Sequence, residues 1–393
     1  MSHQLISHSP DLTKLRAEGY DLETRAGFLL VRDVPYVTSQ REVRRGVLVM
    51  ALDLAGDVTS RPSTHVAYFS GEYPCTEKGT RIGQIENSSQ EQQLGEGVVV
   101  QHTFSAKPLP NGHYPDYYTK VSTYVAILSG PAQKLEPGAS AKTFPVILAE
   151  VDDDDPFHYI DTASSRAGIA SISRKLAIAK VGVVGLGGTG AYVLDLIAKT
   201  PVGEIHLYDG DLYLQHNAFR SPGASSKEEL AARMTKVAYY HQLYSRMRRG
   251  VVCHAVPVDE QNIDELCDLD FVFLCIDDDA KKGVIIRRLI TSDMSFIDVG
   301  LGVQQTDGSL GGILRVTAST KEKRDHLPQR ISTADSIEDN EYDTNIQIAE
   351  LNALNAALAV VKWKKLVGFY RDLKGEHNSY FTIDSNLLAN DDF

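Results

Sequence analysis

The chain has 393 residues, a formal net charge of −12, 42% hydrophobic residues and 23% charged residues. This length suits two domains with a core each, and the composition is that of a soluble globular protein. The acidic balance argues against nonspecific nucleic-acid binding, which needs a basic surface. No apolar run approaches the ~20 residues that span a bilayer, and the N-terminus lacks a signal-peptide pattern. We therefore expect a cytoplasmic protein that binds neither nucleic acid nor membrane.

The chain has only four cysteines, Cys75, Cys253, Cys267 and Cys275, and no two of them form a C-x-x-C pair. Structural zinc sites are usually built from such pairs. We therefore expect no structural zinc and a reducing compartment.

The N-terminal part, from Gly27 to about Glu150, contains short apolar segments between turn residues, which predict a strand-rich α+β domain. The expected strands are 28–31, 46–52, 65–69, 98–100, 124–128 and 145–148. The acidic run 152–155, followed by Pro156, breaks regular structure. It sets the predicted domains at 1–152 and 153–393.

The C-terminal part alternates apolar strands with helices, a pattern that predicts a mostly parallel sheet covered on both faces. We expect strands at 180–184, 204–208, 251–256, 270–276, 295–299 and 312–317, and helices near 164–177, 189–199, 227–247 and 280–291. The polar stretch 318–344 is long for a connection, so we expect it to be functional or mobile. In the last helix, 345–368, an apolar stripe is formed by Leu351, Leu354, Leu358 and Val361.

A glycine loop, G-L-G-G-T-G, follows the first strand of this part and holds Gly185, Gly187, Gly188 and Gly190. Backbone without Cβ lets phosphate oxygens approach the amides at a strand-to-helix turn. The loop also fits the G-x-G-x-x-G pattern of dinucleotide-binding folds, so by itself it is a weak signal.

Polar residues beyond the loop make the prediction more specific. Asp209 follows strand 204–208, where a carboxylate can bind ribose, although a turn aspartate is the alternative. Arg220 lies three residues after Asn217, so both can face one point and Arg220 can bind phosphates. Asp277 follows strand 270–276 and can hold Mg²⁺, whereas a solvated acidic loop is the alternative. Lys236 lies in a basic helix and, taken alone, is more simply a surface lysine.

Together, the glycine loop, the D-x-D-x5-N-x2-R spacing of residues 209–220, R-M-T-K at 233–236 and C-I-D-D at 275–278 resemble the ThiF/MoeB/ubiquitin-activating-enzyme (E1-like) superfamily. The resemblance covers about residues 160–317 and, more loosely, the last helix. It implies a Rossmann-like doubly wound α/β domain that binds ATP and Mg²⁺. The residues it assigns to ATP are Gly185, Gly187, Gly188, Gly190, Asp209, Asp211, Asn217, Arg220 and Lys236, with Asp277 holding the magnesium.

The resemblance also implies a reaction and a homodimer. The C-terminal carboxylate of a ubiquitin-like β-grasp protein would attack the α-phosphorus of ATP, giving an acyl-adenylate and pyrophosphate. An arginine upstream of the first strand would reach the partner subunit's ATP; Arg166 is the better match and Arg174 the alternative. A conjugating-enzyme-like partner and a bacterial conjugation system fit this family.

The sequence departs from ubiquitin-activating members because no cysteine follows Cys275. We expect Cys253 and Cys275 to be inert strand residues, and Cys267 is a weak candidate. The adenylate would pass to a partner's nucleophile or, as an oxyester, to a hydroxyl acceptor, for which the candidates are Ser319, Thr320, Ser332 and Thr333.

The aromatic-rich stretch 101–120 suggests that the N-terminal domain docks the carrier or a conjugating partner. Two rival functions remain. An NAD(P)-dependent oxidoreductase would leave Asn217, Arg220, Lys236 and Asp277 without a joint purpose. A non-catalytic E1-like scaffold would need a damaged site, yet every expected polar position is filled.

Overall fold

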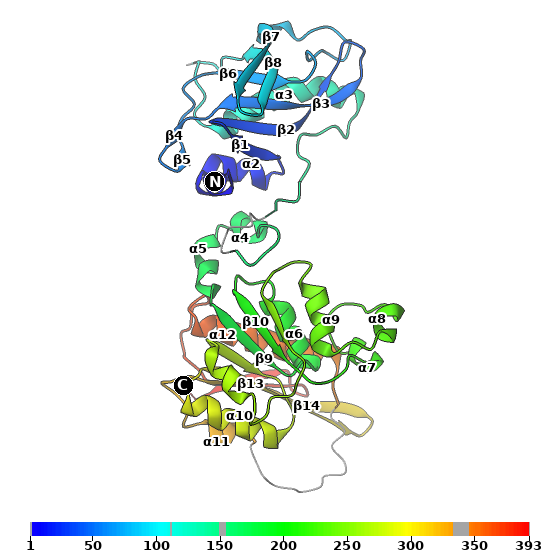
Figure 1. The fold of residues 1–393 in the computed structure, drawn as a ribbon, viewed down its shortest axis with the longest axis vertical. Coiled ribbons are helices and arrows are strands. Elements are labelled where there is room, and N and C mark those ends of the chain that lie inside the picture. The colour runs from blue at the N-terminus through cyan, green and yellow to red at the C-terminus, as the bar shows by residue number, and fades with distance from the viewer. Residues whose placement is uncertain (1, 111, 149–154, 333–345, 393) are drawn as a thin grey trace. The chain divides into compact units, whose positions relative to one another are not determined.

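The computed structural model describes residues 2–110, 112–148, 155–332 and 346–392, with the backbone only for residues 2–4. The chain divides into two compact units, one formed by Met1–Ile147 and Thr162–Gly168 and the other by Leu148–Asp161 and Ile169–Phe393. Figure 1 shows both. None of the helices in the described residues is long and apolar enough to cross a membrane.

The first unit is built on a six-stranded sheet of order β1-β2-β3-β6-β8-β7, and all of its strand pairs are antiparallel. Its elements are α1 (Ser2–His8), α2 (Pro10–Ala17), β1 (Leu22–Arg25), β2 (Phe28–Val37), β3 (Val43–Ala51), β4 (Leu54–Ala55), β5 (Val58–Thr59), β6 (Val66–Ser70), η1 (Gly83–Ile85), β7 (Glu86–Gly95), β8 (Val98–Ser105), α3 (Tyr117–Leu135) and α4 (Thr162–Arg166). The strand-rich α+β class expected for this part is confirmed.

Helix α3 packs on the sheet and corrects two predictions for the first unit. Residues 124–128, predicted as a strand, lie inside α3, which begins where Asp116 accepts a hydrogen bond from Thr119 N. Phe104, Tyr114 and Tyr117 are buried in the core, so the aromatic-rich stretch 101–120 supplies core residues. Residues 145–148 form no strand; only an isolated bridge joins Leu148 to Tyr159.

The second unit has an eight-stranded sheet of order β11-β10-β9-β12-β13-β14-β15-β16. The pairs from β11 to β13 are parallel and those from β13 to β16 antiparallel. Its strands are β9 (Lys180–Val184), β10 (Glu204–Tyr208), β11 (Val251–His254), β12 (Phe271–Leu274), β13 (Phe296–Thr306), β14 (Ser309–Ser319), β15 (Asn378–Thr382) and β16 (Leu387–Asp391). The mixed α/β class with a mostly parallel sheet is therefore confirmed.

The helices of the second unit cover both faces of this sheet (Figure 1). They are α5 (Ala170–Ser173), η2 (Arg174–Leu176), α6 (Gly188–Ile197), α7 (Gln215–Ala218), α8 (Lys227–Ala231), α9 (Lys236–Tyr244), η3 (Ile263–Asp268), α10 (Asp279–Thr291), α11 (Leu327–Arg330) and α12 (Ala349–Leu366). Side chains of α6, α9 and α12 form one core with one face, and those of η3, α10 and α11 form a second core with the other.

Three predictions for the second unit need correction. The helix expected at 164–177 is broken by Gly168, whose φ is +69°, and the helix at 227–247 is broken at Arg233, whose φ is +48°. Of the polar stretch 318–344, residues 318–332 hold the end of β14, a turn and α11, and the rest lies outside the described residues. The predicted stripe of α12 is not its buried face, because Val361 is 41% exposed whereas Asn352, Asn355 and Trp363 are buried.

Candidate functional site

The glycine loop leads from the carboxyl end of β9 into α6. Gly185 N donates to Tyr208 O at 2.8 Å, which holds the loop against the end of β10. A Cβ at Gly190 would lie 1.9 Å from Gly185 O, so the loop closes this tightly only with glycine there. The loop thus presents the positive N-terminal end of α6 at the carboxyl edge of the sheet, where anions bind.

Asp209 and Lys236 lie together against this loop. Asp209 Oδ2 accepts a hydrogen bond from Leu186 N at 2.7 Å, and Asp209 Oδ1 accepts one from Asp211 N at 2.9 Å. Lys236 Nζ lies 3.3 Å from Asp209 Oδ2 and 2.7 Å from Asp211 Oδ2. Asp209 is buried and Lys236 is only 7% exposed, so Lys236 is not a surface lysine. Asp209 also acts as a turn aspartate, since it accepts the loop amide.

Asn217 and Arg220 lie on one turn, at and just beyond the end of α7. Asn217 is buried, its Oδ1 accepts a hydrogen bond from Leu214 N at 2.8 Å, and its carbonyl accepts one from Arg220 N at 3.1 Å. Arg220 Nε is buried and has no hydrogen-bond partner among the described residues. A buried guanidinium donor without a partner costs free energy, so it marks a place where an anionic oxygen would bind.

Asp277 follows β12 at the same carboxyl edge and is exposed. The next residue, Asp278, caps α10 by accepting a hydrogen bond from Lys281 N at 3.0 Å. The pKa of Lys281 is raised, first by the hydrogen bond and charge of Asp278 and then by the charges of Asp211 and Asp277. The carboxylates of Asp211, after β10, and of Asp277 and Asp278, after β12, therefore all act on the ammonium group of Lys281. The sequence analysis missed Lys281, although its position one turn after three aspartates was a signal.

The arginines proposed for the partner subunit's ATP belong to different units. Arg166 ends α4, which groups with the first unit, and its side chain is exposed. Arg174 begins η2, which lies in the second unit before β9.

Two of the candidate hydroxyl acceptors, Ser319 and Thr320, are not brought to the glycine loop. Ser319 is fully buried and pairs with Phe296, at the amino edge of the parallel strands. The five residues of β9 separate this edge from the loop by roughly 15 Å. Thr320 follows Ser319, with its Oγ1 3.4 Å from His377 Nε2. Ser332 is exposed, and Thr333 lies outside the described residues.

Cys275 and Cys253 differ in their burial. Burial strongly raises the pKa of Cys275, as expected for an inert thiol. Cys253 is exposed on the edge strand β11, which corrects the expectation of a buried residue, and its Sγ lies 3.4 Å from Val237 O. Partial burial against α9 also raises the pKa of Cys253. Cys267 lies in η3, with Sγ 3.1 Å from Ser292 Oγ.

Polar residues in the first turn of α12 and just before it also contact the glycine loop, and they were not predicted. Asn352 Oδ1 accepts a hydrogen bond from Thr189 Oγ1 at 3.0 Å, and Gln347 Oε1 accepts one from Gly188 N at 3.3 Å. The leucine stripe lies on a neighbouring face of this helix, about 100° from the asparagines. Buried asparagines one turn apart, at 352 and 355, were the available signal.

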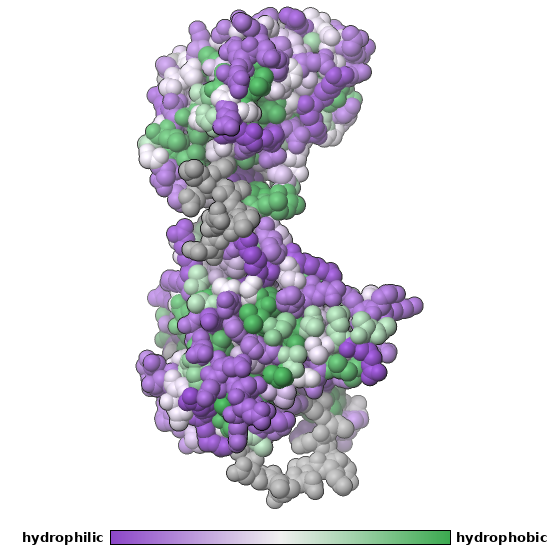
Figure 2. Space-filling model, viewed as in Figure 1, coloured by the Kyte–Doolittle hydropathy of each residue, from purple (hydrophilic) through white to green (hydrophobic). Residues whose placement is uncertain are grey.

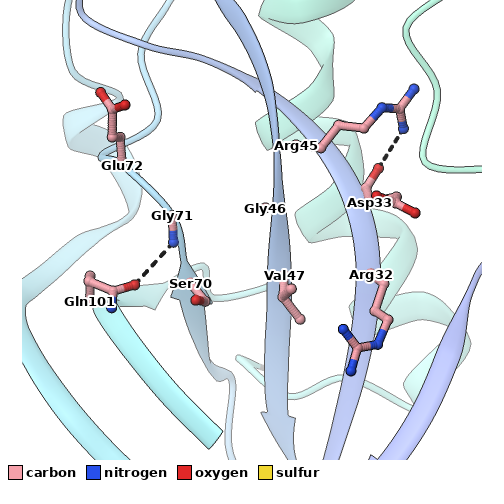
Figure 3. Close-up of a pocket in the computed structure, with 9 residues that line it drawn as sticks. All are labelled: Arg32, Asp33, Arg45, Gly46, Val47, Ser70, Gly71, Glu72 and Gln101. Atoms are coloured by element: carbon pink, nitrogen blue, oxygen red, sulfur yellow. Dashed lines mark hydrogen bonds between the residues drawn. The ribbon is translucent and has the colours of Figure 1, made fainter.

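The first unit has a cavity of about 550 Å³ on its sheet. Figure 3 shows Gln101 directed at Gly71 and Arg45 directed at the carbonyl of Asp33. Two further charged lining residues form ion pairs, Arg32 with Glu23 and Glu72 with Arg44. The cavity is lined by none of the predicted site residues.

Figure 2 shows hydrophilic residues over most of the visible face of both units.

Comparisons with known proteins match the two parts of the chain to different families. Residues 163–388, more than half of the chain, match the model of the ThiF family. Residues 10–162 match a domain of unknown function, DUF6791. A comparison with curated proteins finds no match.

Several solved structures are similar to part of the chain. E. coli MccB with ATP is 18% identical with a TM-score of 0.48, covering 58% of this chain and 70% of that chain. E. coli MccB with MccA-N7isoASN is 17% identical with a TM-score of 0.46, covering 58% and 69%. PaaA is 15% identical with a TM-score of 0.44, covering 56% and 75%.

Proposed function

Because this chain belongs to the ThiF family, we propose that its second unit activates the C-terminal carboxylate of a protein by adenylation with ATP. Membership confirms the resemblance found in the sequence. The single observation that carries the proposal is Arg220 Nε, a buried donor without a hydrogen-bond partner among the described residues. It lies on the turn that Asn352 joins to the glycine loop.

The residues present fit a triphosphate. The N-terminal end of α6 favours negative charge, and Arg220 and Lys236 supply two cations. Lys236 is held by Asp209 and Asp211, so its ammonium is positioned before ATP arrives. Fixed charges that need no rearrangement stabilise developing charge most effectively.

The carboxyl edge also fits Mg²⁺. Mg²⁺ is usually held by one or two carboxylates together with phosphates and water, so a cage of three protein ligands is not needed. The described residues contain no cluster of three or more metal-binding side chains. Asp277, with Asp211 nearby, would hold the ion, which would neutralise phosphate charge.

In the reaction, an oxygen of the substrate carboxylate forms a bond to the α-phosphorus, and the bond from that phosphorus to pyrophosphate breaks. The products are an acyl-adenylate and pyrophosphate. The attacking carboxylate is already ionised at pH 7, so no general base is required. The work of the protein is positioning and charge stabilisation.

The finer assignments are also proposals. The substrate is a ubiquitin-like β-grasp protein, and the adenylate passes to the nucleophile of a partner. The chain acts as a homodimer in which Arg166 reaches the ATP of the partner subunit. The half-buried Leu351 and Leu354 and the exposed Val361 leave apolar surface on α12 that a second copy could cover. The first unit docks the carrier or a conjugating partner.

Calorimetric titration of the full chain with Mg-ATP tests the proposed site. We expect Arg220→Ala and Lys236→Met each to weaken binding at least tenfold, since a charge-assisted hydrogen bond contributes roughly 1.5–3 kcal/mol. Arg287→Ala, an exposed arginine on α10, is the charge-matched control and should bind normally. Wild-type-like affinity of Arg220→Ala would refute the site.

Pyrophosphate exchange into ATP, measured with a candidate β-grasp protein, tests the reaction. Exchange should require the free C-terminal carboxylate of that protein and should be lost in Asp277→Asn. A nicotinamide-dependent enzyme would show no exchange and would bind a nicotinamide nucleotide instead. A scaffold would bind the carrier without exchange.

A further inference from the structure

The glycine loop and the Arg220 turn come from different parts of the second unit, and one side chain of α12 contacts both. Asn352 Oδ1 accepts a hydrogen bond from Thr189 Oγ1 at 3.0 Å. Asn352 Nδ2 donates to the carbonyl of Arg220 at 3.4 Å. Because a carbonyl can only accept, the second contact fixes which way the amide points.

The amide of Asn352 is packed tightly against the loop. Asn352 is 1% exposed, and a Cβ added at Gly188 would lie 2.0 Å from its Nδ2. Any side chain at 188 would therefore push the amide out of its place. The absence of a side chain at Gly188 and the buried amide at Asn352 fit one another.

We propose that Asn352 is a positioning residue that fixes the Arg220 turn relative to the glycine loop. Asn352 need not touch the nucleotide. It acts through the backbone of Arg220, whose guanidinium carries the partnerless Nε. The proposal rests on the proposed function, because fixing Arg220 matters only if its guanidinium binds the triphosphate.

Asn355 offers a matched control on the same helix. It is fully buried and donates through Nδ2 to Gly300 O at 3.0 Å, on β13. Replacing either asparagine by leucine keeps the branched shape and removes a buried hydrogen bond to a backbone carbonyl. Asn355 Oδ1 has no hydrogen-bond partner among the described residues, so Asn355→Leu removes one bond and Asn352→Leu two. The two side chains differ in what they bind: Asn352 bonds to the Arg220 turn, and Asn355 bonds to β13.

The first test is a double-mutant cycle on Mg-ATP affinity. We expect Asn352→Leu to raise the dissociation constant about fivefold, the effect of one lost hydrogen bond. In the Arg220→Ala background the same change should have less than about a twofold effect, because residues that act together are not additive. Asn355→Leu should change affinity by less than about twofold in both backgrounds. Equal effects of Asn352→Leu in both backgrounds, or no effect in either, would overturn the proposal.

A second readout does not need nucleotide. Hydrogen exchange of the amides in residues 217–221 should be faster in Asn352→Leu than in the wild type and unchanged in Asn355→Leu. Unchanged exchange in Asn352→Leu would also refute the positioning role. If the wild type fails to bind Mg-ATP while the exchange result holds, the proposed function fails and the link from Asn352 to the Arg220 turn stands.

Discussion

At the scale of single residues, replacing Gly190 or Gly187 by alanine should have very different effects on stability, although both lie in one loop. Gly190→Ala would place a methyl group 1.9 Å from Gly185 O, whereas the space at Gly187 is open to 4.0 Å. We expect Gly190→Ala to lower the free energy of unfolding by several kcal/mol, since the backbone cannot accommodate the clash. Gly187→Ala should unfold at close to the wild-type urea concentration. Urea unfolding followed by circular dichroism measures both, and equal midpoints would contradict the close packing of the loop.

Several site residues could be predicted because the motif carries their chemistry. Asp209, Asp211 and Lys236 lie in one ion-paired cluster against the glycine loop. The position of Asn352 could not be predicted, because it depends on how α12 packs against α6. A leucine stripe predicts a buried face only when no stronger tertiary contact turns the helix. Here the asparagines face inward and Val361 outward.

At the scale of elements, Arg248 fixes the end of α6. It is fully buried and donates to the carbonyls of Arg249, Ala198, Thr200, Val202 and Gly203. Arg248→Met would leave several of these carbonyls buried without a partner. We expect a loss of about 3–5 kcal/mol in the free energy of unfolding, measured by urea titration. Arg246→Met, an exposed neighbour, should change it by less than about 0.5 kcal/mol. Similar losses in both variants would contradict the capping role.

The junction of α12 and β15 predicts a pH dependence. Burial raises the pKa of Glu376, but hydrogen bonds from Lys362 and Lys365 outweigh it and lower the pKa to about 2. A carboxyl group whose pKa is lower in the folded protein stabilises it above its ordinary pKa of roughly 4.3, and loses this effect as the pH falls toward 2.

The advantage of the wild type over Glu376→Gln in unfolding free energy should therefore shrink as the pH is lowered from 6 to 3. Glu350→Gln, at an exposed residue of α12, is the control and should change the unfolding free energy less. An advantage of the wild type that grows toward low pH would show that the sign is wrong.

The bounds of helices and strands show which local features a sequence pattern predicts and which it does not. The strands at 180–184 and 204–208 were predicted to the residue, because a buried parallel strand is a short apolar run. The break of the helix at 227–247 depends on Arg233 adopting a positive φ and on Thr235 capping α9, and a continuous helical pattern hides both. In the first unit, Tyr124 to Leu128 has strand-like composition, but an N-cap at Asp116 makes it helical.

At the scale of the whole molecule, the proposed homodimer can be tested by mixing two inactive variants. Arg166→Ala removes the arginine given to the partner, and Lys236→Met removes a cation of the chain's own site. In a mixed dimer one site keeps both groups. An equal mixture should recover about a quarter of wild-type pyrophosphate exchange, since half of the dimers are mixed and each has one intact site.

Each variant alone should stay inactive under the same conditions. A mixture that also stays inactive would contradict an arginine supplied by Arg166 in trans, and repeating the mixture with Arg174→Ala would then test the alternative arginine.

The attachment of α6 at both ends has a mechanical consequence. Its first turn carries the glycine loop, and the carbonyl of Ala198, just after its last residue, accepts a hydrogen bond from Arg248. The neighbouring Arg249 donates hydrogen bonds to the carbonyls of Asp155 and Phe157, in the first segment of the second unit. Ten helical residues make a stiff rod of about 15 Å. The position of the loop amides is therefore set from both ends of one stiff helix.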